Sequence, residues 1–317
     1  MQKMMWAYLL HLSKNMWGDP GCTHKYSVFR EELSTDDEVW RQTVEFLPSQ
    51  GINTVVIDVG DGIEYESHPE ISTKGAWSKD RMKKELDYIR SLGMTPIPKL
   101  NFSAGHDAWM KIYSRMLSTP LYYQVCEDLI REVAEVFDYP EYFHLGMDEE
   151  EAEHQRHWSY VVIRQHDLWW HDAYFLFNVC EKLGIRPWVW SDLCWHKPDE
   201  FLTKMPKSVL QSNWSYHQIK KNSDGTYADP KYQTYVTLEE HGFDQVPTSS
   251  SLKSAYNSME TMQLGKENIA PERLKGYMTA SWRTTEPSAR FGLLHDAVQF
   301  GEGIKAVYPE YWKGGMA

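Results

Sequence analysis

The sequence is poor in positive charge, in long apolar runs and in clustered cysteines, and each shortage excludes a class of protein. Asp and Glu number 45 against 33 Lys and Arg, which gives a net charge of −12 at pH 7. No basic stripe of the kind that binds a phosphate backbone is present, which argues against a nucleic-acid-binding protein. The apolar stretch 4–12 is too short to span a membrane. We therefore expect neither nucleic acid nor a membrane as a partner.

The cysteines give no sign of a zinc site or of a dense disulfide framework. Cys22, Cys126, Cys180 and Cys194 form no CxxC pair, and such pairs are the usual mark of a zinc site. Residues 4–12 also lack the charged start and the small-residue cleavage site of a secretory signal, so we interpret them as the first strand. The compartment stays open between a cytoplasmic protein and an exported one whose signal was removed, and the oligomeric state stays open too.

Aromatic residues are abundant, at 14% of the chain with 14 Trp and 19 Tyr. The hydrophobic share of 42% and the charged share of 25% are those of an ordinary globular protein. One interpretation of the aromatics is a Trp-rich core. The other is a sugar-binding cleft, in which aromatic faces pack against pyranose rings. Many of the Trp fall at predicted strand ends, which favours the second interpretation for some of them.

Short apolar runs alternate with longer amphipathic stretches along the chain, and this pattern predicts an α/β fold. Eight strand-then-helix units indicate a (β/α)8 TIM barrel that forms a single domain over residues 1–317. A doubly wound open sheet is the alternative, but it would usually carry a Gly-rich phosphate loop after its first strand, and residues 13–21 do not form one. The predicted strands are 4–12, 53–59, 95–102, 142–147, 186–191, 209–214, 245–248 and 276–282, and the predicted helices are 36–49, 79–92, 120–137, 160–183, 232–241, 252–264 and 289–301.

The fourth predicted strand, 142–147, is the most informative segment because it ends in three acids, Asp148, Glu149 and Glu150. Burying an ionised carboxylate is costly unless it is paired, so acids at a strand tip usually face a polar mouth. In a parallel α/β protein, ligands bind at that mouth. The competing interpretation is a cap for the next helix, since acids favour helix N-termini. The segment alone leaves both interpretations open; the context given below favours Asp148 and Glu149 as the catalytic pair and leaves Glu150 as the helix cap.

Other predicted strand ends carry residues that suit the same kind of site. The C-terminal ends of barrel strands converge on one face. Each residue alone could be structural, because a Trp can fill the barrel, an acid can cap a helix and a His can be hydrogen-bonded in the core. Their gathering on one face favours a functional site. The candidates beside the acid pair are Lys14, His106, His144, Trp190, Asp192, Trp214, Trp282 and Glu286.

A metal site is the competing chemistry for the strand-4 tip. His106, His144, Asp148 and Glu149 could supply ligands. However, no HxH or HExxH pair sets a zinc-binding face. We therefore expect no metal and no other cofactor.

The strand-4 residues His144-x-Gly146-x-Asp148-Glu149 resemble the His-x-Gly-Gly-Asp-Glu motif of glycoside hydrolase family 20, the β-N-acetylhexosaminidases. Three further parts of the chain support the resemblance. Segment 98–106 is similar to the family's Pro-Glu-Ile-Asp-Met-Pro-Gly-His, with one residue extra, and segment 11–15 to its Asp-Val-Ser-Arg-His. Trp282 and Glu286 correspond to the Trp and Glu after strand 8. The resemblance spans the whole predicted barrel.

This resemblance implies a role for each candidate. Glu149 is the general acid and base, which requires a raised pKa while Asp148 stays ionised. Asp148 orients the 2-acetamido group, whose carbonyl oxygen attacks the anomeric carbon in a substrate-assisted mechanism. For neighbouring residues to cooperate, the chain must already turn at the strand tip, because adjacent strand residues point to opposite faces. The remaining candidates support the pair or bind the sugar. Hydrogen bonds to the pair come from His106 and His144. The walls of the sugar pocket are Trp190, Trp214 and Trp282, and its polar contacts are Lys14, Asp192 and Glu286.

The chain departs from the family pattern at four positions. Lys14 stands where the family has an Arg that grips sugar hydroxyls, and a Lys cannot form the same bidentate fork. Lys99 and Asn101 replace a Glu and an Asp after strand 3, and Met147 replaces a Gly beside the pair. We therefore expect an exo-acting glycosidase for a terminal β-linked 2-acetamido sugar, with its sugar specificity left open. The alternatives are a non-catalytic or differently specific carbohydrate-binding barrel and a metal-dependent hydrolase.

Overall fold

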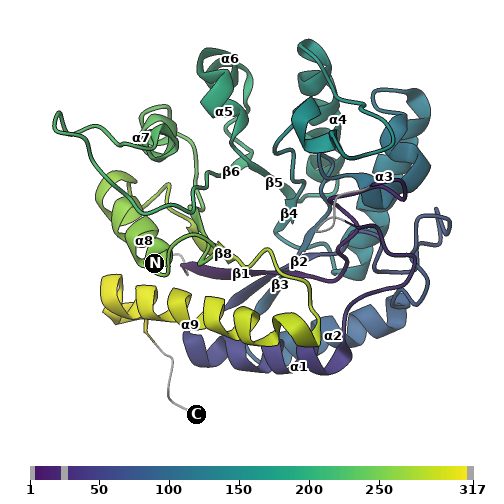
Figure 1. The fold of residues 1–317 in the computed structure, drawn as a ribbon, viewed down its shortest axis with the longest axis horizontal. Coiled ribbons are helices and arrows are strands. Elements are labelled where there is room, and N and C mark those ends of the chain that lie inside the picture. The colour runs from purple at the N-terminus through teal and green to yellow at the C-terminus, as the bar shows by residue number, and fades with distance from the viewer. Residues whose placement is uncertain (1–3, 23–27, 313–317) are drawn as a thin grey trace.

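Eight parallel strands form one sheet that curls into a barrel (Figure 1). The computed structural model describes residues 4–22 and 28–312. Neighbours in the sheet follow the chain from β1 to β6, and β8 lies between β1 and β7. Parallel bridges from Gln211 to Gln245 and from Trp214 to Thr248 bring the two ends of the sheet together. The strands are β1 (Met5–His11), β2 (Thr54–Asp58), β3 (Thr95–Lys99), β4 (Tyr142–His144), β5 (Arg186–Trp190), β6 (Leu210–Ser212), β7 (Thr248–Ser249) and β8 (Gly276–Ala280).

Helices surround the strands (Figure 1). The first, second and last of the long helices lie beneath the sheet in this view, and the others flank it at the right, top and left. The α-helices are α1 (Asp37–Phe46), α2 (Lys79–Ser91), α3 (Pro120–Val136), α4 (Asp167–Lys182), α5 (Leu193–His196), α6 (Pro198–Lys204), α7 (Gln233–Glu240), α8 (Asn257–Asn268) and α9 (Arg290–Val307). Short 3₁₀ turns are η1 (Leu47–Gln50), η2 (Ala108–Arg115), η3 (Ala152–Gln155), η4 (Pro230–Tyr232), η5 (Pro287–Ala289) and η6 (Pro309–Tyr311).

Local sequence fixes the start of several helices. Asp36 before α1, Ser78 before α2 and Thr119 before α3 each accept a hydrogen bond from the backbone N–H three residues further on, at 2.9, 3.2 and 3.2 Å. These residue types are the preferred helix caps because they satisfy an otherwise unpaired N–H group. Pro120 occupies the first position of α3, where its missing N–H costs nothing. The helices that carry the barrel are therefore placed by residues visible in the sequence.

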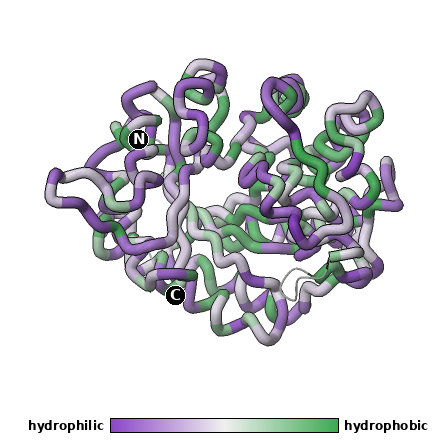
Figure 2. The backbone as a smooth tube through the Cα atoms, turned by 45° about the horizontal axis from the view of Figure 1, so that its top comes forward, coloured by the Kyte–Doolittle hydropathy of each residue, from purple (hydrophilic) through white to green (hydrophobic). Residues whose placement is uncertain are grey.

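Alternation along the strands divides the core into two layers. In β1, Ala7 and Leu9 point into the barrel, whereas Tyr8 and Leu10 belong to the larger layer between strands and helices. All seven residues of β1 are buried, as expected for a strand that is covered on both faces. Figure 2 shows hydrophobic stretches gathered toward the middle of the molecule. Because this packing fills the barrel, ligands can enter only above its ends.

The predicted barrel is confirmed, and the doubly wound alternative is excluded by the closing bridges and the strand order. Several predicted bounds were wrong. Strand β4 ends at His144 and not at residue 147, because the chain turns there. Helix α4 begins at Asp167, seven residues later than predicted, and α5 and α6 were not predicted. The single-domain assignment stays a prediction. Within residues 4–22 and 28–312, none of the helices combines the length and apolar character needed to cross a bilayer.

Candidate active site

A cavity of about 300 Å³ opens above the C-terminal ends of the strands. Its walls come from the segments that follow β1, β3, β4, β6 and β8, so they are brought together only by closure of the barrel. In a barrel of this kind the C-terminal face is where active sites lie. The lining residues are Met16, Trp17, Asn101, His106, Asp148, Glu149, Trp214, Tyr216 and Trp282.

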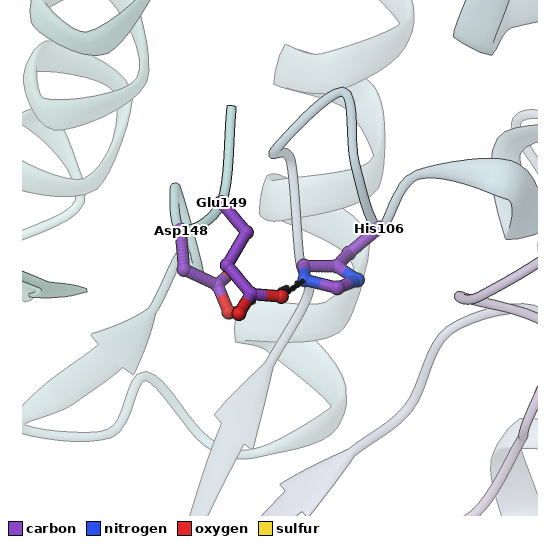
Figure 3. A group of neighbouring side chains, drawn as sticks. All are labelled: His106, Asp148 and Glu149. Carbon is purple, nitrogen blue, oxygen red and sulfur yellow. Dashed lines mark hydrogen bonds and ion pairs between the residues drawn. The ribbon is translucent and has the colours of Figure 1, made fainter. Parts of the chain in front are cut away.

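The turn after β4 brings both predicted catalytic carboxylates to this cavity. Gly146, Met147 and Glu149 all have positive φ values, of 73°, 70° and 50°. This left-handed backbone breaks the alternation of the strand, so Asp148 and Glu149 both line the cavity, and Figure 3 shows their carboxylates side by side facing His106. The predicted turn at the strand tip is confirmed.

Asn101 organises the turn and holds Asp148. Its side-chain amide donates to Oδ1 of Asp148 at 2.8 Å, and its carbonyl oxygen accepts the backbone N–H groups of Ser103 at 3.0 Å and Met147 at 3.3 Å. Nε2 of His106 lies 3.5 Å from Oδ2 of Asp148. A Cβ atom added at Gly146 would lie 1.9 Å from the Asn101 oxygen. The departure from the family pattern at Asn101 therefore leaves Asp148 firmly oriented, by an amide in place of an acid.

Glu149 is held by two histidines. Nε2 of His106 lies 3.0 Å and Nε2 of His154 lies 3.1 Å from the same carboxylate oxygen, Oε2. Burial opposes the charged form, but the hydrogen bonds and positive charge of the histidines outweigh it and hold the pKa of Glu149 below its usual range. Burial also opposes the charge on His106, yet Asp148 and Glu149 raise the pKa of that imidazole to about 9. The expectation that the surroundings raise the pKa of Glu149 is wrong for the substrate-free site.

Asp192 lies directly behind the acid pair. Its Oδ2 accepts the backbone N–H of Glu149 at 2.9 Å, and its side chain is buried and does not line the cavity. Burial, followed by the negative charge of Asp148, raises the pKa of Asp192 well above its ordinary value. Asp192 therefore supports the turn at Glu149 and is not placed to contact a ligand in this cavity.

The aromatic wall is formed by residues from three segments, which follow β1, β6 and β8. Trp214 stacks on Tyr216 with ring centroids 5.1 Å apart, and Trp282 lies 6.4 Å from both Tyr216 and Trp17. Trp214 and Trp282 therefore line the cavity as expected. Trp190 lies one layer deeper, 1% exposed, where it packs against Trp282 at 5.9 Å. It supports the wall without being part of it.

Three further candidates lie apart from the acid pair. His144 is fully buried, its Nδ1 accepts the N–H of Gly146 at 3.1 Å, and burial together with Lys99 lowers its pKa well below the usual range. His144 thus supports the turn and makes no contact with the carboxylates. Glu286 forms an ion pair with Arg30, and Lys14 is half-buried, with its pKa lowered by burial and by Arg30. Neither Lys14 nor Glu286 lines the cavity.

Lys99, which stands where the family pattern has an acid, belongs to a buried cluster of charged groups with Asp58 and His11. The Lys99 ammonium forms an ion pair with Asp58 that is almost completely removed from solvent. Nδ1 of His11 lies 3.4 Å from Oδ2 of Asp58, and the His11 ring lies 5.2 Å from Trp17 and 5.8 Å from Trp282. The cluster therefore sits beneath the aromatic wall. The replacement of an acid by Lys99 is balanced by the carboxylate at the end of β2.

Glu150 is not the helix cap that we expected. No α-helix follows it until α4 at Asp167. Instead, Oε2 of Glu150 accepts the backbone N–H of Ala104 at 2.8 Å, and the carboxylate pairs with buried Arg164 at 3.2 Å. It ties the segment after β4 to the segment after β3.

Sequence reasoning missed five residues of the site. Trp17, Met16 and Tyr216 lie just beyond predicted strand ends, so a search extended by a few residues would have found them. Asn101 was identified only as a departure from the family pattern. His154 lies in an irregular segment, and no motif or spacing pointed to it.

His106, Asp148 and Glu149 offer donor atoms that lie within 4.8 Å of one another. One nitrogen and two carboxylates could hold a divalent cation, although each of these side chains is already engaged in the hydrogen bonds and ion pairs described above. The expectation that the protein needs no metal stays a prediction.

Neither a protein-family model nor a curated protein matches the chain. Solved structures do match, and they show the fold, an α/β barrel of eight parallel strands. A Streptomyces plicatus β-hexosaminidase variant, solved with its product GlcNAc, shares 13% identity at a TM-score of 0.63, with 100% of this chain and 69% of that chain covered. A β-N-acetylhexosaminidase from Bacteroides fragilis shares 13% at 0.60, with coverage of 99% and 72%.

A chitobiase from Flavobacterium johnsoniae shares 17% identity at a TM-score of 0.58, and the match covers 99% of this chain but only 52% of that enzyme. The chain thus spans about half the length of that enzyme. Likeness at this level of identity shows the fold. The protein has the fold of the family 20 β-N-acetylhexosaminidase barrel in a divergent form, as the strand-4 motif predicted.

Proposed function

We propose that this protein is a glycoside hydrolase that releases a terminal β-linked 2-acetamido sugar by substrate-assisted, retaining hydrolysis. The observation that carries the proposal is the pair Asp148 and Glu149 at the tip of β4, side by side in a cavity walled by Trp17, Trp214 and Trp282. A volume of about 300 Å³ is at the lower end of the range for ligand pockets, roughly 300–1,000 Å³. That size suits a single sugar unit and hence an exo mode of action.

Each acid has a distinct role in the reaction. Asp148, fixed by the Asn101 amide at 2.8 Å, holds the acetamido group so that its carbonyl oxygen forms a bond to the anomeric carbon. The bond from that carbon to the leaving oxygen breaks, and the leaving oxygen takes a proton from Glu149. In the second step Glu149 removes a proton from water, and the water oxygen bonds to the anomeric carbon. The bond from that carbon to the acetamido oxygen breaks, which opens the oxazolinium ring with net retention.

The proton for the first step is stored on the acid's partner. His106 carries a proton at neutral pH, since its pKa is about 9, and its Nε2–H donates to Glu149 over 3.0 Å. The pair therefore shares one proton beyond this Nε2–H, and in the reactive form that proton is on Oε1 of Glu149 while His106 is neutral. A low pKa for Glu149 in the free site is thus compatible with general acid catalysis, because the imidazolium and the carboxylate act as one unit.

Replacing Glu149 with Gln tests this proposal. The Glu149→Gln variant should lose cleavage of an aryl β-N-acetylglucosaminide by about 100-fold or more, since general acid catalysis contributes about 10²–10⁴-fold. The control is Glu153→Gln, the same change at a residue whose side chain is 67% exposed and pairs with Arg156, and it should leave the rate unchanged. Full activity in Glu149→Gln would contradict the proposal.

The same assay separates the two alternatives. A thiazoline mimic of the oxazolinium ion should inhibit turnover; binding of this mimic without turnover of any glycoside would favour a non-catalytic carbohydrate-binding barrel. Activity that disappears with a chelator and returns with a divalent cation would instead assign the cluster of His106, Asp148 and Glu149 to a metal-dependent hydrolase.

A further inference from the structure

Two imidazoles converge on one oxygen of Glu149, and only one of them belongs to the strand-3 segment that resembles family 20. His106 follows β3 and is buried, whereas His154 lies on η3 with a side chain that is 34% exposed. Their Nε2 atoms lie 3.0 and 3.1 Å from Oε2. A single hydrogen bond leaves a carboxylate free to swing, but two donors from different directions fix its plane. Oε1 is then the oxygen left for a ligand in the cavity that Glu149 lines.

The segment that carries His154 is anchored on both sides of it. The side-chain amide of Gln155 donates to the Ala104 carbonyl and to the Val162 carbonyl, and its oxygen accepts the Val162 N–H at 2.6 Å. Glu150 accepts the Ala104 N–H at 2.8 Å on the other side. Gln155 is 1% exposed, so these bonds are buried. The position of His154 is therefore set by the same strand-3 segment that carries His106.

Gly105 allows the two segments to approach closely. A Cβ atom at this position would lie 2.6 Å from the Glu149 carbonyl oxygen and 3.5 Å from Cβ of His154. Real Cβ atoms are not found so near a backbone oxygen, so any larger residue would push the segments apart. Gly105 thus makes room for a clamp in which both histidines reach the same carboxylate.

We propose that His154 is a positioning residue for the general acid: with His106 it clamps Oε2 of Glu149 and leaves Oε1 aimed at the leaving oxygen. This inference rests on the proposed function. In the first step the Oε1–H bond of Glu149 breaks and that proton passes to the leaving oxygen, while His106 and His154 keep their Nε2–H groups on Oε2. His154 touches neither the sugar nor the leaving group, and it acts through Glu149 alone.

Other charged groups near the clamp come from every segment that packs on it. Asp148 and Asp192 lie beside Glu149, and the charges of Asp148 and Glu149 add to burial in raising the pKa of Asp192. Lys99 acts on His106 from below, and Glu151 acts on His154 from its own segment. These groups are unchanged when His154 is replaced, so differences between variants report the loss of the clamp itself.

A leaving-group series distinguishes positioning from a merely structural role. A dinitrophenyl leaving group departs with little help from an acid, whereas a methoxyphenyl group needs a proton. His154→Ala should lower kcat/KM for the methoxyphenyl β-N-acetylglucosaminide by about tenfold or more and change the dinitrophenyl value by less than about threefold. His154→Gln, whose amide can still donate, should recover part of the loss. His196→Ala is the control, because His196 pairs with Glu151 and not with Glu149.

Equal losses on both substrates, or no loss on either, would overturn the positioning role. If His154→Ala fails to fold, the inference is tested instead by an NMR titration of the imidazoles in the wild-type chain and in the Glu149→Gln variant. Glu149→Gln should lower the pKa of His154, because the hydrogen bond and charge of Glu149 are the main causes that raise it; an unshifted His154 would also overturn the inference. A wild-type protein that cleaves no glycoside would contradict the proposed function and the positioning role together. An active wild type with losses independent of the leaving group would contradict only the latter.

Discussion

Removal of the Lys99 ammonium should destabilise the protein much more than removal of the whole ion pair with Asp58. The two side chains are 0% and 3% exposed. Lys99→Met therefore leaves the Asp58 carboxylate buried, with the His11 ring 3.4 Å away as its remaining ion-pair partner among residues 4–22 and 28–312. Breaking a buried pair in this way costs about 3–5 kcal/mol. The double variant Lys99→Met with Asp58→Leu removes both charges and should recover most of that loss, since apolar replacement of a buried pair is often neutral.

The pH dependence of the free energy of unfolding gives a second estimate of what the ion pair of Lys99 and Asp58 contributes to stability. Burial opposes the Asp58 charge, but Lys99 and His11 prevail and lower the pKa of that carboxyl from 3.8 to about 2. One unit corresponds to about 1.4 kcal/mol, so the linkage is worth about 2 kcal/mol. Because the folded-state pKa is depressed, this stability is present above about pH 4 and is lost as the pH falls toward about 2. Lys99→Met should flatten this part of the profile.

Urea unfolding followed by Trp fluorescence at several pH values measures both effects. Lys83→Met is the matched control, because Lys83 is exposed on α2 and forms no ion pair among the described residues, and it should change the free energy of unfolding by less than about 0.5 kcal/mol. The reasoning would be refuted if Lys99→Met cost no more than Lys83→Met, or if the double variant were less stable than the single one.

Three further predictions concern the site. Asn101→Ala should lower kcat on an aryl β-N-acetylglucosaminide by about tenfold or more, because a hydrogen bond to a charged group is worth about 1.5–3 kcal/mol and Asp148 loses its donor at 2.8 Å; an unchanged kcat would contradict this. Trp214→Ala should raise KM by up to about tenfold, since stacking contributes about 0.5–1.5 kcal/mol; a fall in kcat alone would place Trp214 outside the sugar wall. Gly146→Ala should lower the Tm more than Gly184→Ala does: the φ values are 73° and 74°, but only at Gly146 would Cβ meet another side chain, at 1.9 Å. Equal Tm changes would show that the contact with Asn101 is unimportant.

The barrel and the acid pair could be predicted because both follow from patterns within short stretches of sequence. Apolar runs of strand length recur eight times along the chain, with amphipathic stretches between them. The strand-4 tip combines a His, a Gly and two acids within six residues, so its resemblance to a family motif could be recognised although the overall identity to the solved structures cited above is only 13–17%. Once the barrel is predicted, no further sequence pattern is needed to infer that the strand ends lie together.

The layers of the site could not be predicted, because depth is set by packing and not by position along a strand. Trp190 and Trp214 both end predicted strands, yet Trp190 is 1% exposed beneath the wall and Trp214 lines the cavity. The sign of the pKa shift at Glu149 was missed for a related reason. It depends on hydrogen bonds from His106 and from His154, and His154 reaches the carboxylate from an irregular segment. Contacts of this kind arise from tertiary structure alone.

The most direct test of the central claim is the rate and stereochemistry of aryl glycoside cleavage by the wild-type protein, with and without the 2-acetamido group. Two aryl β-glycosides that differ only at that group are compared, and NMR identifies the first-formed anomer of the product. The account predicts cleavage of the 2-acetamido substrate with retention, and a rate lower by about 100-fold or more for the 2-hydroxy analogue, because only the acetamido oxygen can replace an enzyme nucleophile. Equal rates on both substrates, or an inverted product, would contradict substrate-assisted hydrolysis by Asp148 and Glu149.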